Sequence, residues 1–410
     1  LHGGLAISEM SGILSLIAPR PLLMCNHEKD NNFAFLPSAM LRSYNNAYPI
    51  YKLKNAESNI SYKIFNLTHG YMVEDRESML GWFDLHLKGI GDGKPKKETY
   101  FEQLEEEDLM VFPTGKRDPN IMTTFDYCKM KGDLFKNELI NSKSINQKDK
   151  INDLIKIIGV HSKPHIINSF ELSQIDNWRR FRIKTSDNKL IPVLVYSPNK
   201  SSKNYTILCS SEGKNNIPFS LVQEKINSGE GLVIADLSGT GEMLSTNSRH
   251  DNNNDLRTIS RSLLWFDKTL IGEWVNELGL IVEFINKEFN YKKIKIDGTK
   301  EAGLAGLFLS VINDNIDSVV LRDAPVSYVL DNRDNIDYFS MAVNLPGIIK
   351  WGDISLSAAM SGKDILFINP LSISGRKIEG NELNKYRQEF STLQNLCNKT
   401  DNRIDFKLKQ

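Results

Sequence analysis

The chain has 410 residues, which is enough for about two to three domains with at least one sizeable hydrophobic core. Its apolar content of 40% and its charged content of 25% are those of an ordinary globular protein. Lys and Arg together number 51, and Asp and Glu also number 51, so no net charge would attract nucleic acid or an anionic membrane. No apolar run approaches the length of a transmembrane helix. Neither nucleic acid nor membrane is therefore expected as a partner.

The start of the chain and its cysteines leave the cellular compartment open. The first residue is Leu1 rather than Met, and no basic segment followed by an apolar segment marks a signal peptide. Four cysteines show no paired spacing and are interpreted as thiols of the core. They are Cys25, Cys128, Cys209 and Cys397. The sequence predicts neither a disulfide framework nor a metal site.

Residues 19–69 have the pattern of a strand, a helix and a second strand in a buried parallel sheet. Two short apolar runs, Pro19–Cys25 and Tyr62–Leu67, are separated by a segment of helix length. Asp30 follows the first run, and His69 follows the second. Because sites in open α/β sheets form at the carboxyl ends of strands, both side chains are expected at one edge of the sheet. Each also has an ordinary interpretation, Asp30 as a helix cap and His69 as a turn residue.

Asp30 and His69 together suit the chemistry of a serine hydrolase. A serine hydroxyl becomes a good nucleophile when a neutral imidazole accepts its proton. A carboxylate on the other imidazole nitrogen fixes the tautomer and stabilises the charged form. The sequence therefore offers His69 as a candidate base and Asp30 as its orienting acid.

The same segment resembles the last part of an α/β-hydrolase domain of the acetyl xylan esterase type, a carbohydrate esterase. The shared features are an Ile-Ala-Pro-Arg-Pro-Leu-Leu strand, a Glu-Lys-Asp turn, a Tyr-rich helix, a His-Gly turn and a Trp-Phe pair near a helix end. Here they are Ile17–Leu23, Glu28–Asp30, Tyr44–Tyr51, His69–Gly70 and Trp82–Phe83. The resemblance implies that Asp30 is the triad acid and His69 the base, in the family order after a Ser that would lie upstream of residue 1. It also implies an acetylated carbohydrate as substrate, with no metal or organic cofactor.

Residues 1–95 are expected to be the C-terminal part of this catalytic domain. One helix is predicted to begin near Pro37 and another near Asp75, which is interpreted as its cap. Two strands and a few helices cannot cover both faces of a parallel sheet, whose strands are apolar on both sides. Neighbouring strands are therefore expected to be missing, and the chain is predicted to lack the front of its first domain.

Residues 96–150 are predicted to be a charged, solvated connector, and residues 151–410 a second α/β-hydrolase-like domain. Helical segments alternate with the later strands of that domain, which indicates a mostly parallel sheet covered on both faces. One long helix is predicted over Leu263–Phe289. The predicted strands are Arg180–Lys184, Leu190–Tyr196, Tyr205–Cys209, Gly231–Asp236, Lys293–Asp297, Ser318–Arg322, Asp364–Asn369 and Arg403–Leu408.

The second domain is predicted to be catalytically vacant. Its nucleophile turn should follow the strand at 293–297, where Lys300 occupies the Ser position of a Gly-x-Ser-x-Gly motif. The acid should follow the strand at 364–369, but Pro370–Gly375 contains no carboxylate. No His follows the last strand. Lys300 is interpreted as structural because no partner serine accompanies it.

The sequence therefore favours a serine carboxylic-ester hydrolase, an acetyl xylan-type deacetylase, whose activity requires the upstream Ser. This chain alone is expected to be inactive. Two alternatives stay open: a serine peptidase of the prolyl-oligopeptidase group, and a non-catalytic carbohydrate-binding or scaffolding protein. The substrate's acyl group and sugar, and the oligomeric state, are not predicted. Secretion or a bacterial periplasm is compatible with the resemblance.

Overall fold

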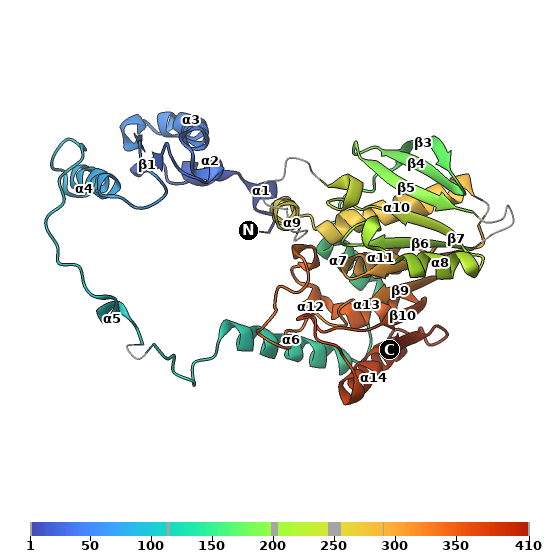
Figure 1. Ribbon diagram of the computed structural model, residues 1–410. Helices are drawn as coiled ribbons and strands as arrows, with labels where there is room; N and C mark the ends of the chain where they lie inside the picture. Colours follow the sequence, from blue (N-terminus) through green and yellow to red (C-terminus); the bar gives the residue numbers. More distant parts are fainter. Residues whose placement is uncertain (1, 113–114, 198–203, 245–255, 290, 409–410) are drawn as a thin grey trace. The chain divides into compact units, whose positions relative to one another are not determined.

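The computed structural model describes residues 2–112, 115–197, 204–244, 256–289 and 291–408. The chain divides into two compact units (Figure 1). The first unit comprises Gly4–Ile121, and the second unit comprises Met122–Gln410 together with Leu1–Gly3. Among the described residues, no helix has both the length and the apolar character that crossing a membrane requires.

The first unit is built on two parallel strands, β1 (Leu22–His27) and β2 (Ile60–Phe65). The helix α3 (Pro37–Leu53) connects them and begins at Pro37, as predicted. The helix α4 (Val73–Lys88) follows β2. The shorter helical segments are α1 (Gly4–Ile7), α2 (Met10–Ser15), 3₁₀ turns at Phe33–Phe35 and Glu57–Asn59, and α5 (Glu106–Leu109).

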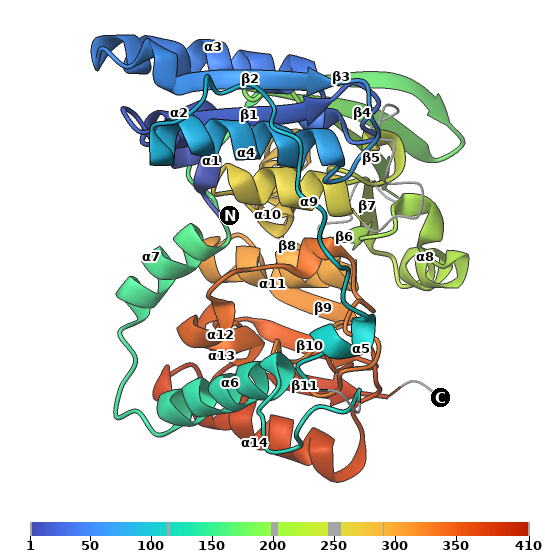
Figure 2. The ribbon, with the colours of Figure 1, turned by 90° about the vertical axis from the view of Figure 1, so that its left-hand side faces the viewer.

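The two faces of β1 have different neighbours, because successive side chains of a strand point to opposite sides. Leu22 and Met24 pack on the apolar cluster that contains Tyr51 of α3. Cys25 and His27 line a pocket with residues of α4. Figure 2 shows α3 and α4 on opposite sides of the two strands. The sheet therefore positions the end of β1 between two helices.

The predicted connector at residues 96–150 differs from the structure. From Met122 onward the chain belongs to the second unit. There α6 (Thr124–Ile140) and α7 (Gln147–Ile157) pack on that unit's hydrophobic core. Lys136 of α6, for example, is almost buried, with its Nζ 2.8 Å from Glu389 Oε2. The charges that suggested a solvated connector are therefore partly the polar side of packed helices.

The second unit contains a nine-stranded sheet in the order β11-β10-β9-β8-β6-β7-β5-β4-β3. Pairing is parallel from β11 to β7 and antiparallel from β7 through β5 and β4 to β3. Figure 2 shows β6, β8, β9 and β10 following one another in this order. The strands are β3 (Ile166–Ile175), β4 (Trp178–Thr185), β5 (Leu190–Tyr196), β6 (Asn204–Ser210), β7 (Gly231–Ala235), β8 (Lys293–Thr299), β9 (Ser318–Arg322), β10 (Asp364–Ile368) and β11 (Ile404–Lys407).

Helices cover both faces of this sheet. On one face the main core includes Ile207 and Val233, together with α10, its neighbour α11, and α13, which packs on α11. On the other face Leu208 and Leu232 pack with α8. The helices are α8 (Phe219–Asn227), α9 (Arg257–Trp265), α10 (Leu270–Glu288), α11 (Glu301–Ile312), α12 (Ile348–Trp351), α13 (Asp353–Ser361) and α14 (Gly380–Leu396), with 3₁₀ turns at Lys214–Asn216, Gly241–Met243 and Met341–Val343. The prediction of a largely parallel sheet between helical layers is confirmed.

The single helix predicted over Leu263–Phe289 is wrong, because the structure has two helices there, α9 and α10. Between them Asp267 adopts a positive φ of 60°. Thr269 then caps α10, its hydroxyl accepting a hydrogen bond from the backbone N–H of Gly272 at 2.9 Å. The apolar periodicity continues across this break, so it does not reveal the cap.

Candidate active site

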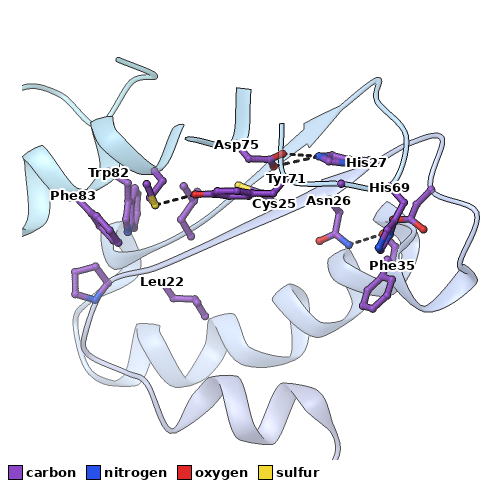
Figure 3. A pocket seen from close by; sticks show the side chains of 15 residues that line it. Leu22, Cys25, Asn26, His27, Phe35, His69, Tyr71, Asp75, Trp82 and Phe83 are labelled. Atoms are coloured by element: carbon purple, nitrogen blue, oxygen red, sulfur yellow. Dashed lines mark hydrogen bonds and ion pairs between the residues drawn. The ribbon is translucent and has the colours of Figure 1, made fainter. Parts of the chain in front are cut away.

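Asp30 and His69 lie side by side in the first unit, at the carboxyl ends of its two parallel strands. Asp30 lies three residues beyond β1, and His69 four residues beyond β2. The Nδ1 of His69 is 2.8 Å from Oδ2 of Asp30. The Asp30 side chain is only 5% exposed, whereas that of His69 is 59% exposed. Figure 3 shows His69 at one end of a pocket. Residues distant in sequence are thus brought into hydrogen-bonding contact at the predicted edge.

The surroundings of Asp30 favour its charged form. The backbone N–H of Asn32 donates a hydrogen bond to Asp30 Oδ1 at 2.8 Å, and this bond is the largest cause that lowers the pKa of the carboxyl. Burial acts in the opposite direction, and the hydrogen bond with His69 lowers the pKa further. A carboxylate at Nδ1 directs the other ring nitrogen, Nε2, away from Asp30. Among the described residues, Nε2 of His69 has no hydrogen-bond partner.

The pocket beside this pair measures about 560 Å³. Its wall combines the end of β1, the His69 turn and the inner face of α4, including the aromatic side chains of Trp82 and Phe83. Phe35 also lies against the imidazole of His69, with ring centroids 5.6 Å apart. No serine is among the residues that line this pocket. No group of three or more His, Cys, Asp or Glu in the described part of the chain could hold a metal ion.

Cys25 lines the pocket, but it is a poor candidate for a nucleophile. Burial, together with the charge of Asp75, raises the pKa of its thiol to about 11. Cys128, in contrast, is exposed, so the prediction that all four cysteines belong to the core is wrong for this one.

We expect iodoacetamide at about pH 8 to modify Cys128 and to leave Cys25 unmodified. At that pH a thiol with a pKa of about 11 is thiolate in roughly one molecule in a thousand, and the thiolate is the reactive form. Peptide mass spectrometry at increasing reaction times measures both sites. Modification of Cys25 as rapid as that of Cys128 would show that the thiol is activated.

A second histidine–carboxylate pair, His27 and Asp75, also lines the pocket and was not predicted. His27 Nε2 is 3.0 Å from Asp75 Oδ2, and both side chains are buried. His27 Nδ1 is 2.6 Å from the carbonyl oxygen of Thr68, the residue before His69. Asp75 also accepts a hydrogen bond from the backbone N–H of Met72 at 2.9 Å. This pair therefore ties the start of α4 and the end of β1 to the turn that carries His69.

Asp75 was predicted to cap the helix that follows His69. The structure places it in the third position of α4, while Met72 is the N-cap. Its carboxylate nevertheless binds the backbone N–H of that N-cap residue, as in the reciprocal half of a capping box. The prediction was therefore wrong in position, although the side chain does bind a backbone N–H at the start of the helix.

In the second unit, Lys300 occupies the turn between β8 and α11. Its backbone has φ 54° and ψ −130°, a strained conformation for a residue with a side chain. Nucleophiles of α/β hydrolases lie on such a sharp strand-to-helix turn. Lys300 Nζ is 2.6 Å from Glu212 Oε1. Burial lowers the pKa of Lys300, but the hydrogen bond and charge of Glu212 raise it overall, which favours the protonated amine over the free amine that a nucleophile requires.

Two glycines make this turn possible by allowing close backbone contact. A Cβ on Gly298 would lie 2.6 Å from the Cα of Gly303 and 2.9 Å from the carbonyl carbon of Ala302. Both contacts are with backbone, which cannot move aside as a flexible side chain can. The turn thus depends on small residues on each side of Lys300.

We expect Gly298→Ala to destabilise the second unit by about 3 kcal/mol, because the added methyl overlaps backbone atoms. Gly279→Ala is the matched control. Its Cβ would meet only Leu309 Cδ1 at 3.7 Å, and the change should stabilise α10 by about 0.5–1 kcal/mol. Denaturant unfolding measures both. Equal stabilities of the two variants would contradict the close backbone contact.

Comparisons with known proteins agree with the fold. No protein-family model matches the chain, and no curated protein matches it. A Bacteroides fragilis structure, provisionally described as an acetyl xylan esterase, matches with a TM-score of 0.50 and 13% identity, over 72% of this chain and 84% of that one. The chain therefore has an α/β-hydrolase fold.

Two further structures are similar to this chain at lower scores. An acetyl xylan esterase from Thermoanaerobacterium has a TM-score of 0.40 and 11% identity, over 67% of this chain and 91% of that one. A glucuronoyl esterase from Solibacter usitatus has a TM-score of 0.41 and 10% identity, over 64% of this chain and 87% of that one.

Proposed function

We propose that the first unit contributes the acid and base of a serine carboxylic-ester hydrolase. The observation that carries this proposal is the 2.8 Å contact between Asp30 and the Nδ1 of a largely exposed His69, at the ends of two adjacent parallel strands. In this role His69 accepts the proton of the serine hydroxyl through Nε2 and later donates it to the departing alcohol. Asp30 holds the imidazole in the required tautomer and stabilises its protonated form.

The nucleophile would come from a segment other than the described residues of Gly4–Ile121. No serine lines the pocket beside His69. Among the described residues, β1 pairs only with β2, so its other edge is open to a further strand. We place the serine there, in the catalytic domain of the complete gene product. Its oxygen would attack the ester carbonyl, and nearby backbone N–H groups would bind the oxyanion.

The proposed substrate is an acetylated carbohydrate of the acetyl xylan type. The support is the sequence resemblance around Asp30 and His69, together with the description of the Bacteroides fragilis structure. This hydrolysis needs no metal or organic cofactor. The second unit is proposed to be catalytically vacant, because its nucleophile turn presents a protonated Lys300.

Labelling with a fluorophosphonate probe tests the proposal, because such probes react with an activated serine. The complete gene product should become labelled on one serine, and His69→Ala should abolish the labelling. His165→Ala, at an exposed position of the second unit, is the control and should leave labelling unchanged. Absence of labelling in well-folded wild-type protein would refute a serine hydrolase.

A further inference from the structure

A second pocket lies at the Lys300 turn, within the second unit. It measures about 350 Å³. Its wall is formed by Glu212 after β6, by Lys300 and Glu301 at the start of α11, and by residues 336–344. The turn that would carry a nucleophile is thus kept, with a cavity beside it. The polar groups in this cavity indicate what it can bind.

The carboxylate of Glu301 is buried and incompletely paired. The side chain is 1% exposed, and its Oε1 accepts a hydrogen bond from the backbone N–H of Ser340 at 2.5 Å. Its Oε2 has no hydrogen-bond partner among the described residues. A buried acceptor without a partner is costly and uncommon. Glu301 also lines the pocket, and a ligand whose hydrogen-bond donor reaches Oε2 would satisfy it.

Lys300 supplies donors in the same cavity. Its ammonium carries three N–H groups, and Glu212 Oε1 is its hydrogen-bond acceptor among the described residues. The remaining N–H groups can bind acceptor oxygens of a ligand. The pair of Lys300 and Glu212 also offers a donor and an acceptor close together, which matches a hydroxyl group that accepts one bond and donates another.

Tyr338 adds a flat apolar surface that is held in place from behind. The side chain is 43% exposed and lines the pocket. A Cβ on Gly375 would overlap its ring, so the ring lies directly against that glycine. Phe339 packs edge-on against the same ring, with centroids 5.0 Å apart. Lys300 Nζ lies over the ring, 5.6 Å from its centroid, so a ligand that packs on the ring also meets the ammonium.

We propose that this pocket binds a neutral sugar of a carbohydrate chain. The hydroxyls of a sugar donate to Glu301 and accept from Lys300, while its C–H face packs on Tyr338. An anionic ligand would meet the carboxylates of Glu212, Glu301 and Asp337. A cationic ligand would meet Lys300 and Arg257 in the same wall. This inference does not depend on ester hydrolysis by the first unit.

Methyl NMR of the whole chain, labelled at methionine, tests the binding. Met341 lines this pocket, and Met79 lines the pocket beside His69, so one sample reports on both sites. The variant Met341→Leu assigns the first signal. The probes are xylotriose, cellotriose and mannotriose, each added separately. At least one should shift the Met341 signal along a saturating curve with a Kd of about 1 mM.

The variant Tyr338→Ala should weaken binding at least tenfold, because it removes the aromatic ring on which the sugar packs. The control is Tyr127→Ala, which removes another exposed tyrosine near a lysine, Lys131. It should leave the Kd unchanged. Glu301→Gln keeps the acceptor for Ser340 and should weaken binding about tenfold through loss of the charged acceptor.

The Tyr338→Ala and Glu301→Gln variants must show the wild-type thermal transition before their affinities are compared. A Met341 signal that none of the three sugars shifts would overturn the proposal. So would a shift that both variants leave unchanged. Because the nucleophile serine is not involved, failure of the fluorophosphonate experiment leaves this result standing, and the reverse also holds.

Discussion

Asp30→Asn is expected to lower the kcat of the complete protein for an acetylated sugar by about 10⁴-fold. The amide would present N–H groups to Nδ1 of His69, where the carboxylate now accepts. The imidazole would then favour the tautomer with its proton on Nε2, which cannot accept the proton of a serine. KM should change little, because the Asp30 side chain is only 5% exposed and acts on the substrate through His69. Steady-state kinetics on an acetylated oligosaccharide measures both constants.

The matched control is Asp92→Asn, which removes a carboxylate of the same unit that pairs with an exposed lysine, Lys94, at 2.6 Å. This change should leave kcat within about twofold of the wild type, because exposed ion pairs contribute little. Equal kcat values for Asp30→Asn and the wild type would show that Asp30 does not orient the base. The proposed function would then have to give Asp30 the role of a helix or turn cap.

Most strands of the second unit could be predicted because they are nearly continuous apolar runs, as is typical of buried parallel strands; β5 is antiparallel but is also apolar along its length. Leu190–Tyr196 and Ser318–Arg322 were predicted with the observed bounds. The strand β3 was missed because only three of its ten positions are even partly buried, and its sequence is mixed with Asn, Ser, Glu and Gln. It lies at the edge of the sheet, where an apolar pattern is not required. Edge strands of this kind are specified by the neighbour with which they pair.

Of the candidate site, only the pair at the ends of the two parallel strands could be predicted from the sequence. Asp30 and His69 each follow an apolar run, and parallel strands place their ends together. His27 lies inside a strand and Asp75 inside a helix, so no local pattern links them. One signal was available: His27 is two residues from Cys25, hence on the same face of β1. His27 and Asp75 are buried because α4 packs against β1, and the hydrophobic periodicity of the sequence does not predict that packing.

Asp75→Ala is expected to destabilise the first unit by about 3–5 kcal/mol. The change removes the partner of a buried His27 nitrogen and the acceptor of the Met72 N–H. His27 is only 5% exposed, and a buried polar group without a partner costs free energy. Calorimetry of the whole chain can separate this loss, because two compact units need not unfold in one transition. Only the transition of the first unit should move to lower temperature.

The control for this prediction is Asp84→Ala, a change on the same helix. Asp84 binds Lys88 and Lys96, whose side chains are largely exposed and can be solvated when the carboxylate is removed. Its effect should therefore be clearly smaller than that of Asp75→Ala. If both variants unfold alike, the buried pair is no more important than a carboxylate whose partners are exposed lysines. If Asp75→Ala alone is destabilised, Asp75 supports the buried His27, whose Nδ1 contacts the carbonyl oxygen of Thr68 next to His69.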